Sequence, residues 1–241
     1  MKYKIIVFLS IILAVAGISQ VKNFKQYTNQ SIFPLKKGSY WIYRGPTKWV
    51  KISDPENKVV QKTITWKMEV LDSVTKDDIT IATIKGFPTD LAWYEESKPR
   101  GDYLLITVNT TQYYLIQGKN KEDILASINN NNRLDEDILN QEDEILDLPL
   151  TIGKRFAGDT TRQDNWYCWY IEDAQKVDLT YIKGVKLLGK INQYRLVYRT
   201  MPDHQIIEFV PKVGIIRYIY VHHGTASETD LKLIEFHLGT D

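Results

Sequence analysis

The chain has 241 residues, of which 43% are hydrophobic, 25% are charged and 12% are aromatic, and its formal charge is +1 at neutral pH. This globular composition can bury a sizeable core, as one β domain or two small ones. A net charge near zero without a basic stripe argues against a nucleic-acid-binding surface.

Residues 1–19 have the features of a signal peptide. Lys2 and Lys4 form a basic start, and the apolar run from 5 to 16 ends in Ala-Val-Ala, which fits a small-residue cleavage site, with Ser19 as the alternative. The run is too short to predict a membrane span, and no cysteine lies near the cleavage site to carry a lipid anchor. We therefore expect export, to the periplasm or to the extracellular space, with no stable membrane span after removal of the signal.

The rest of the chain divides into four segments by composition. We expect residues 20–32 to be a polar, flexible lead-in and residues 120–147 to be an acidic connector of helical or loop character. These segments flank and separate two β units, at 33–119 and 148–241. We expect residues 33–241 to fold as one compact domain.

The clearest hydrophobic period lies in the first unit, where apolar side chains alternate with polar ones. Such alternation is typical of an antiparallel strand with one buried and one solvated face. The apolar positions are Val60, Ile64, Trp66, Met68 and Val70. The other strands expected in this unit, after a turn that begins at Phe33, are an aromatic strand ending at Gly45 and strands at 49–52, 79–84, 103–108 and 112–116.

The connector contains two predicted short helices. The first spans 121–128 with Asn120 as its N-cap, and the second spans 134–146. The acidic residues of this segment suggest a calcium site at first sight, but their spacing lacks the central glycine and alternating ligands of an EF-hand loop. We interpret them as a solvated acidic face or linker.

In the second unit, short strands follow one another with turn residues between them, at 166–173, 177–182, 194–200, 204–210, 215–222 and 231–238. Cys168 is the only cysteine, so the chain has no internal disulfide. Because it lies in an apolar strand, we predict a buried structural thiol rather than a nucleophile.

One motif, apolar-Pro-Leu-x-x-Gly-x-x-aromatic, occurs twice, at 33–41 and 148–156. Proline fixes an extended backbone, glycine permits the turn, and the aromatic residue fills the core. The repeat predicts two related β units. Together these patterns predict a mainly β fold, an antiparallel meander that forms a curved sheet or an open barrel or sandwich, with one or two short helices in the middle.

The opening Pro-Leu-x-x-Gly-x-x-Trp-x-Tyr at 34–43 resembles that of uncharacterised exported bacterial β-rich proteins. The ending Tyr-Val-His-His-Gly at 220–224 is similar to the close of such chains. The resemblance covers these two short segments. It implies a secreted β protein and carries no catalytic residues.

The C-terminal part contains a predicted β-hairpin whose turn spans 211–214. The register follows from this turn and from the alternation of apolar residues. It places these residues opposite one another: Val210 and Ile215, Glu208 and Arg217, Ile207 and Tyr218, and Asp203 and His222. One apolar face is expected to be buried, with Ile207, Phe209, Ile216, Tyr218 and Tyr220.

The same hairpin carries the candidate polar site, Asp203, His204, His222 and His223. Adjacent strand residues point to opposite faces, so Asp203 and His222 share one face while His204 and His223 share the other. A contact of Asp203 with His222 could fix a tautomer or raise its basicity, or be an ordinary polar contact at a hairpin end. A zinc site usually needs three or four ligands and each face offers two, so no cofactor or metal is predicted.

A second candidate surface is aromatic: Trp41, Tyr43, Trp166 and Trp169 could face a sugar or an apolar ligand on a concave sheet. Core packing is the other interpretation of these residues, because tryptophans here alternate with polar positions. Motifs of serine hydrolases, phosphate-binding loops and zinc peptidases are absent from the sequence.

These observations favour an exported, non-enzymatic β module. Its expected partner is a small apolar molecule, a glycan or an envelope protein, and not a nucleic acid. The alternative is a metal-dependent or histidine-assisted hydrolase centred on the 203–223 hairpin.

Overall fold

The computed structural model describes residues 32–51, 54–118, 121–131, 139–186 and 189–240. Residues 33–241 form one compact unit. The predicted signal peptide and nearly all of the predicted lead-in therefore lie outside the described residues. Within the described ranges, no helix is long and apolar enough to cross a membrane.

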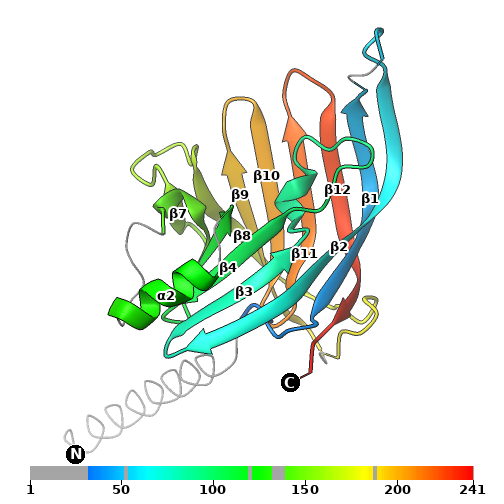
Figure 1. The fold of residues 1–241 in the computed structure, drawn as a ribbon. Coiled ribbons are helices and arrows are strands. Elements are labelled where there is room, and N and C mark those ends of the chain that lie inside the picture. Colours follow the sequence, from blue (N-terminus) through cyan, green and yellow to red (C-terminus); the bar gives the residue numbers. More distant parts are fainter. Residues whose placement is uncertain (1–31, 52–53, 119–120, 132–138, 187–188, 241) are drawn as a thin grey trace, which may run out of the picture. The chain divides into compact units, whose positions relative to one another are not determined.

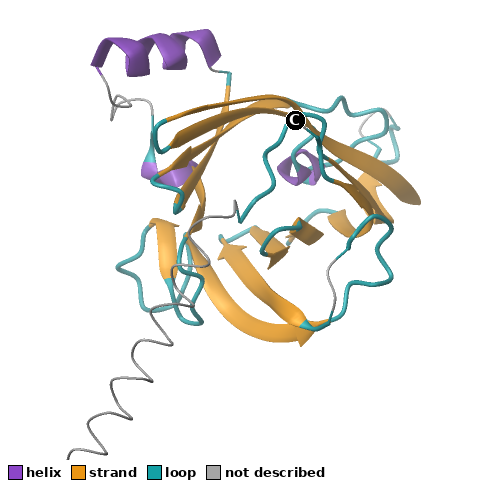
Figure 2. Cartoon of the chain, turned by 90° about the horizontal axis from the view of Figure 1, so that it is seen from below, coloured by secondary structure: helices purple, strands orange, loops and turns teal. Residues whose placement is uncertain are grey.

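The mainly β prediction is confirmed, because twelve strands form a single antiparallel sheet that curls into a nearly closed barrel (Figures 1 and 2). The strand order is β6-β5-β4-β3-β2-β1-β12-β11-β10-β9-β8-β7. The strands of the first half are β1 (Tyr40–Val50), β2 (Val59–Lys76), β3 (Ile79–Lys85), β4 (Asp102–Val108), β5 (Gln112–Gln117) and β6 (Glu144–Asp147). Those of the second half are β7 (Arg155–Gly158), β8 (Cys168–Val177), β9 (Ile191–Arg199), β10 (Asp203–Val210), β11 (Gly214–His222) and β12 (Ser227–His237).

The two halves are built alike, as the repeated motif predicts. In the first half, Gly38 has a φ of +81° and its N–H donates to Val70 O at 2.9 Å. In the second half, Gly153 has a φ of +89° and its N–H donates to Ile171 O at 2.9 Å. Both glycines adopt a left-handed backbone that other residues rarely tolerate. The equivalent motif therefore starts each six-stranded meander in the same way.

The barrel interior is filled mainly by large apolar side chains. Along β1, Trp41 and Tyr43 are fully buried, whereas the next residue, Arg44, is exposed. The ring of Phe33 lies 5.7 Å from that of Trp41 and 5.7 Å from that of Phe209, measured between centroids. Phe33 of the opening motif therefore packs in the barrel interior against aromatic residues of both halves.

A second, smaller core lies on the outer face of the sheet. Helix α2 (Lys121–Asn131) packs there with Ile124 and Ile128 against apolar side chains of three strands. The strand residues of this cluster are Ile79, Ile81, Leu104, Ile106 and Ile116. The first predicted helix is therefore confirmed, and its proposed cap, Asn120, lies outside the described residues.

Some predicted elements are wrong. β1 is one strand rather than two, because Gly45 lets β12 pass closely; a Cβ there would lie 1.9 Å from Asp230 O. The predicted strand at 177–182 is absent, since β8 ends at Val177 and Asp178 Oδ1 accepts the Thr180 N–H at 2.8 Å in a turn.

The second predicted helix is also wrong where the structure describes it. Residues 132–138 lie outside the described ranges, a short 3-10 turn spans Gln141–Asp143, and β6 follows directly. Pairing with the edge of β5, in which Leu146 lies opposite Tyr113, outweighs the helix-like spacing of these residues.

Candidate functional site

The β10–β11 hairpin has the predicted register over most of its length. Glu208 pairs with Arg217, Ile207 with Tyr218, and Asp203 with His222. The predicted pairing of Val210 with Ile215 is wrong, because Val210 lies opposite Gly214 and a bulge follows. The five residues of the predicted apolar face, Ile207, Phe209, Ile216, Tyr218 and Tyr220, are all buried.

One face of the hairpin end carries a compact polar group. The His222 imidazole Nδ1 lies 2.8 Å from Asp203 Oδ1, and the Tyr220 hydroxyl donates to the same oxygen at 2.6 Å. Burial, followed by this hydrogen bond, raises the pKa of the Tyr220 hydroxyl well above its usual value. Tyr220 therefore stays protonated and holds Asp203 as an acceptor.

Both contacts converge on Oδ1. Among the residues that the structure describes, neither Asp203 Oδ2 nor His222 Nε2 forms a hydrogen bond. Both atoms are open to solvent. Among the described residues, the only side-chain polar atom that is buried and lacks a hydrogen-bond partner is Thr107 Oγ1. Each can therefore receive a polar group of a ligand.

Trp93 covers this polar group. Its ring centroid lies 4.2 Å from that of His222 and 6.4 Å from that of Tyr220, and 48% of the residue is exposed. Its backbone has a φ of +53°, a left-handed conformation that is unfavourable for an aromatic residue. Lys98 Nζ donates to Ala92 O at 2.7 Å beside it, and the burial of that ammonium lowers its pKa. We call Trp93, Asp203, Tyr220 and His222 the Trp93 site.

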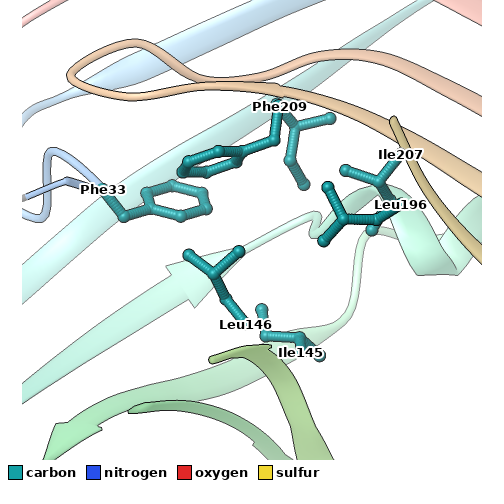
Figure 3. Close-up of a pocket in the computed structure, with 7 residues that line it drawn as sticks. Phe33, Ile145, Leu146, Leu196, Ile207 and Phe209 are labelled. Atoms are coloured by element: carbon teal, nitrogen blue, oxygen red, sulfur yellow. The ribbon is translucent and has the colours of Figure 1, made fainter. Parts of the chain in front are cut away.

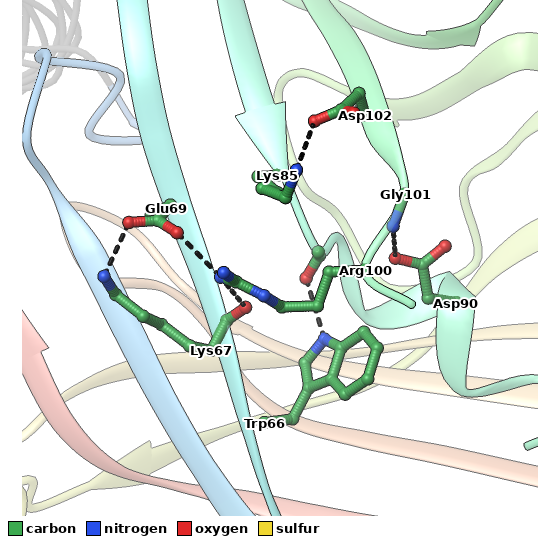
Figure 4. Close-up of polar contacts among 9 residues, drawn as sticks. Trp66, Lys67, Glu69, Lys85, Asp90, Arg100, Gly101 and Asp102 are labelled. Carbon is green, nitrogen blue, oxygen red and sulfur yellow. Dashed lines mark hydrogen bonds and ion pairs between the residues drawn. The ribbon is translucent and has the colours of Figure 1, made fainter. Parts of the chain in front are cut away.

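The loop that carries Trp93, residues 86–101 between β3 and β4, is anchored at both ends, as Figure 4 shows. At its start, Trp66 Nε1 donates to Gly86 O at 2.8 Å. At its end, the Gly101 N–H donates to the buried Asp90 carboxylate at 2.8 Å, and Arg100 pairs with Glu69 at 2.7 Å. These anchors fix the two ends of the loop on either side of Trp93.

The other face of the hairpin end holds the remaining two predicted histidines. His223 Nε2 and His204 Nδ1 lie 3.3 Å apart, and the Trp166 ring lies edge-on to His204 with centroids 6.1 Å apart. Burial, and then the neighbouring His223, lowers the pKa of His204. The structure thus brings the four polar residues together as two separate pairs, on opposite faces of the hairpin.

The predicted aromatic residues do not form one surface. Trp41 and Tyr43 are fully buried in the barrel, where Trp41 Nε1 donates to Val213 O at 2.6 Å and Tyr43 OH donates to Ile215 O at 3.0 Å. Trp169 is 6% exposed. Trp166 alone of the four is partly accessible. The inward face of the nearly closed sheet is core, which removes three of these residues from contact with a ligand.

The described residues include no group of three or more His, Cys, Asp or Glu side chains arranged to hold a metal ion. The single thiol, Cys168, is buried, and burial raises its pKa, as in an inert structural cysteine. The Asp203–His222 pair can orient an imidazole, but its hydroxyl neighbour Tyr220 donates to the carboxylate rather than to the ring.

A second candidate region lies where the sheet meets itself. β6 and β7 are the two edge strands, and the chain connects them through 148–154. Behind them is an apolar cavity with room for about one water molecule (Figure 3). Its lining comes from the opening motif, from β6 and from three strands of the second half: Phe33, Ile145, Leu146, Leu196, Ile207, Phe209 and Ile215.

The β6–β7 junction, Glu144–Asp147 with Arg155–Gly158, contains a buried carboxyl. Glu144 is 5% exposed, and burial, followed by the charge of Asp147, raises its pKa to about 7. The Gln112 amide at 3.3 Å, Lys154, and the Ala157 backbone oppose this shift. Glu144 thus titrates near neutral pH.

Sequence reasoning missed Trp93, Tyr220 and Glu144 as site residues. Trp93 lies in a loop without any hydrophobic period, and its contact with His222 joins distant parts of the chain. The position of Tyr220 two residues before His222 is a usable signal, because strand residues two apart share a face. For Glu144 no sequence signal distinguishes it from the other acids of the connector.

No protein-family model matches the chain, and no curated protein matches it. Two solved structures are similar to it. One is a candidate lipoprotein from Parabacteroides distasonis ATCC 8503, with 12% identity over 86% of this chain and 98% of that chain and a TM-score of 0.39. The other is a candidate exported protein with a YmcC-like fold from Bacteroides fragilis NCTC 9343, with 10% identity, the same coverage of both chains and a TM-score of 0.39. At these TM-scores neither likeness carries an argument about function.

Proposed function

We propose that this protein is an exported, non-enzymatic β module that binds a sugar-like ligand at the Trp93 site. The observation that carries the proposal is the half-exposed indole of Trp93 above a carboxylate and an imidazole that each keep an open position. Sugar rings present an apolar face and a rim of hydroxyls. An accessible aromatic face beside a few convergent polar groups suits both parts of such a ligand.

The roles of the site residues follow from their contacts. Trp93 would stack on the apolar face of a sugar ring. Asp203 Oδ2 would accept a hydroxyl proton, and His222 Nε2 would donate to or accept from a second hydroxyl. Tyr220 and the anchored loop hold these groups in place before the ligand arrives, which lowers the entropic cost of binding.

Export supports the choice of ligand, since the predicted signal peptide at 1–19 would deliver the protein to a compartment rich in envelope and extracellular glycans. An apolar ligand or an envelope protein would use the exposed indole but would leave the Asp203–His222 pair without a role.

The test is a titration of the purified protein with a panel of soluble neutral oligosaccharides, followed by tryptophan fluorescence and calorimetry. We expect saturable binding that Trp93→Ala abolishes and that Asp203→Asn and His222→Gln each weaken about tenfold, with unchanged circular dichroism. Trp166→Ala is the matched control, because this tryptophan contacts the other histidine pair. Loss of binding in Trp166→Ala but not in Trp93→Ala would overturn the assignment, and so would the absence of saturable binding to the whole panel.

A further inference from the structure

The repeat relates the two places where the halves meet. The offset between the motifs is 115 residues, from Gly38 to Gly153, so β7 is the counterpart of β1. The β12–β1 contact in one half therefore corresponds to the β6–β7 contact in the other. β12 and β1 are paired from Tyr40 with His237 to Trp49 with Ser227. β6 and β7 stand instead at the two ends of the strand order.

Side chains close the β6–β7 junction in place of a backbone ladder. Lys154 forms an ion pair with Asp147 at 2.9 Å and donates to Asp147 O at 2.9 Å. The backbone N–H of Ala157 in β7 faces the Glu144 carboxyl of β6 and opposes the rise in its pKa. Ala157 is a bulged residue with a φ of +53°, which turns its amide away from the β8 ladder.

A matching bulge occurs on β6. The register of β5 with β6 shifts between Tyr113, opposite Leu146, and Tyr114, opposite Glu144, so Ile145 is the extra residue. Ile145 and Leu146 form one wall of the apolar cavity (Figure 3). The position of β6 therefore determines the size of that cavity.

We propose that Glu144 latches the β6–β7 junction, which is shut while its carboxyl is protonated and which opens the cavity to an apolar ligand when the carboxyl ionises. The groups that face Glu144 come from every element around it. They are Gln112 and Tyr114 of β5, Asp147 of its own strand, Lys154 of the connection and the Ala157 amide of β7.

The balance of these groups sets the direction of the switch. An ionised Glu144 in the shut junction is buried beside the like charge of Asp147, whereas in an open junction water solvates it. With a pKa of about 7 when shut and an ordinary pKa when open, ionisation shifts the ratio of open to shut molecules by a factor on the order of 100. The shift begins above the ordinary glutamate pKa and is complete above about pH 7.

The probe for the test is the neutral apolar dye N-phenyl-1-naphthylamine, titrated into the purified protein between pH 5 and pH 8.5. We expect dye binding to rise with pH in the wild type and to stay low and flat in Glu144→Gln, whose amide keeps the hydrogen bonds without a charge. Glu235→Gln is the matched control, because Ile42, the counterpart of Ala157 at the same offset, pairs with Glu235 in the laddered junction. Dye binding by this control variant should rise with pH as it does in the wild type.

Asp147→Asn provides an independent arm if Glu144→Gln fails to fold. Removing the like charge lowers the pKa of Glu144, so the midpoint of dye binding should move to lower pH. A purely structural loss of the Lys154 ion pair would raise dye binding at every pH and leave the midpoint in place. The proposal is overturned if wild-type dye binding is independent of pH, if Glu144→Gln keeps the rise, or if the Asp147→Asn midpoint does not move.

Discussion

The halves of the barrel meet at two junctions, and the two are closed by different interactions. At β12–β1, strands of eleven residues each pair through the backbone. At β6–β7, strands of four residues each are joined by a carboxyl, a lysine and a bulged amide. One repeated motif therefore starts two equivalent meanders, yet the two junctions between them differ. The β12–β1 junction is a continuous backbone ladder, and the β6–β7 junction depends on side-chain contacts.

The largest expected effect tests whether the halves share one core across both junctions. Phe209 is 2% exposed and its ring contacts Phe33 of the other half, so Phe209→Ala should destabilise the protein by about 3–5 kcal/mol. Thermal and urea unfolding should remain a single transition. Two separate transitions, or a loss below about 1 kcal/mol, would mean that the halves fold independently.

The next effect isolates the β6–β7 junction. The pKa of Glu144 is raised to about 7, so the stability that it contributes is full below the ordinary glutamate pKa and is lost as the pH rises through 7. Glu144→Gln should therefore be up to about 2–3 kcal/mol more stable than the wild type at pH 8 and nearly equal at pH 4.5. Urea unfolding at the two pH values measures this difference, and a variant that is less stable at pH 8 would refute the buried charge.

A smaller effect tests the equivalence of the two motifs. Gly38 and Gly153 both have positive φ, and a Cβ at either position would meet no atom closer than 4.0 Å. The backbone conformation alone should thus decide the cost of alanine, about 1–2 kcal/mol for each variant. Thermal melts of Gly38→Ala and Gly153→Ala should agree closely. A cost at one position only would contradict the structural repeat.

The smallest effect concerns the outer face of the second half. Glu208 lies between Arg195 at 3.3 Å and Arg217 at 3.2 Å, in a chain of ion pairs that extends to Glu172 and Asp230. Both arginines keep another carboxylate partner in Glu208→Gln. The free energy of unfolding should therefore fall by only about 0.2–1 kcal/mol, and by less in high salt. Unfolding in low and high salt checks this ranking against the core variant.

Alternation of side chains allowed much of the hairpin to be predicted. It placed Asp203 opposite His222 and Glu208 opposite Arg217, because a period of two leaves little choice of register once one face is buried. The turn was less predictable. Lys212 and Gly214 adopt φ values of +72° and +94°, which tightens the turn and shifts the nearest pair.

Closure of the sheet could not be predicted from local patterns. Alternation assigns Trp41 and Tyr43 to one face, but whether that face is open to a ligand depends on β1 pairing with β12, at the far end of the chain. The same holds for Trp93, whose place over His222 depends on the anchored loop rather than on any period. The exposure of Trp41 and Tyr43 and the position of Trp93 therefore depend on long-range contacts, which local sequence patterns do not reveal.

Hydrogen exchange of backbone amides, followed by mass spectrometry at pH 6 and pH 8 and corrected for intrinsic rates, tests the difference between the junctions most directly. We predict that peptides covering β6 and β7 exchange faster than those covering β1 and β12, and that only the β6–β7 peptides lose further protection at pH 8. Equal protection of the two junctions at both pH values would contradict the account.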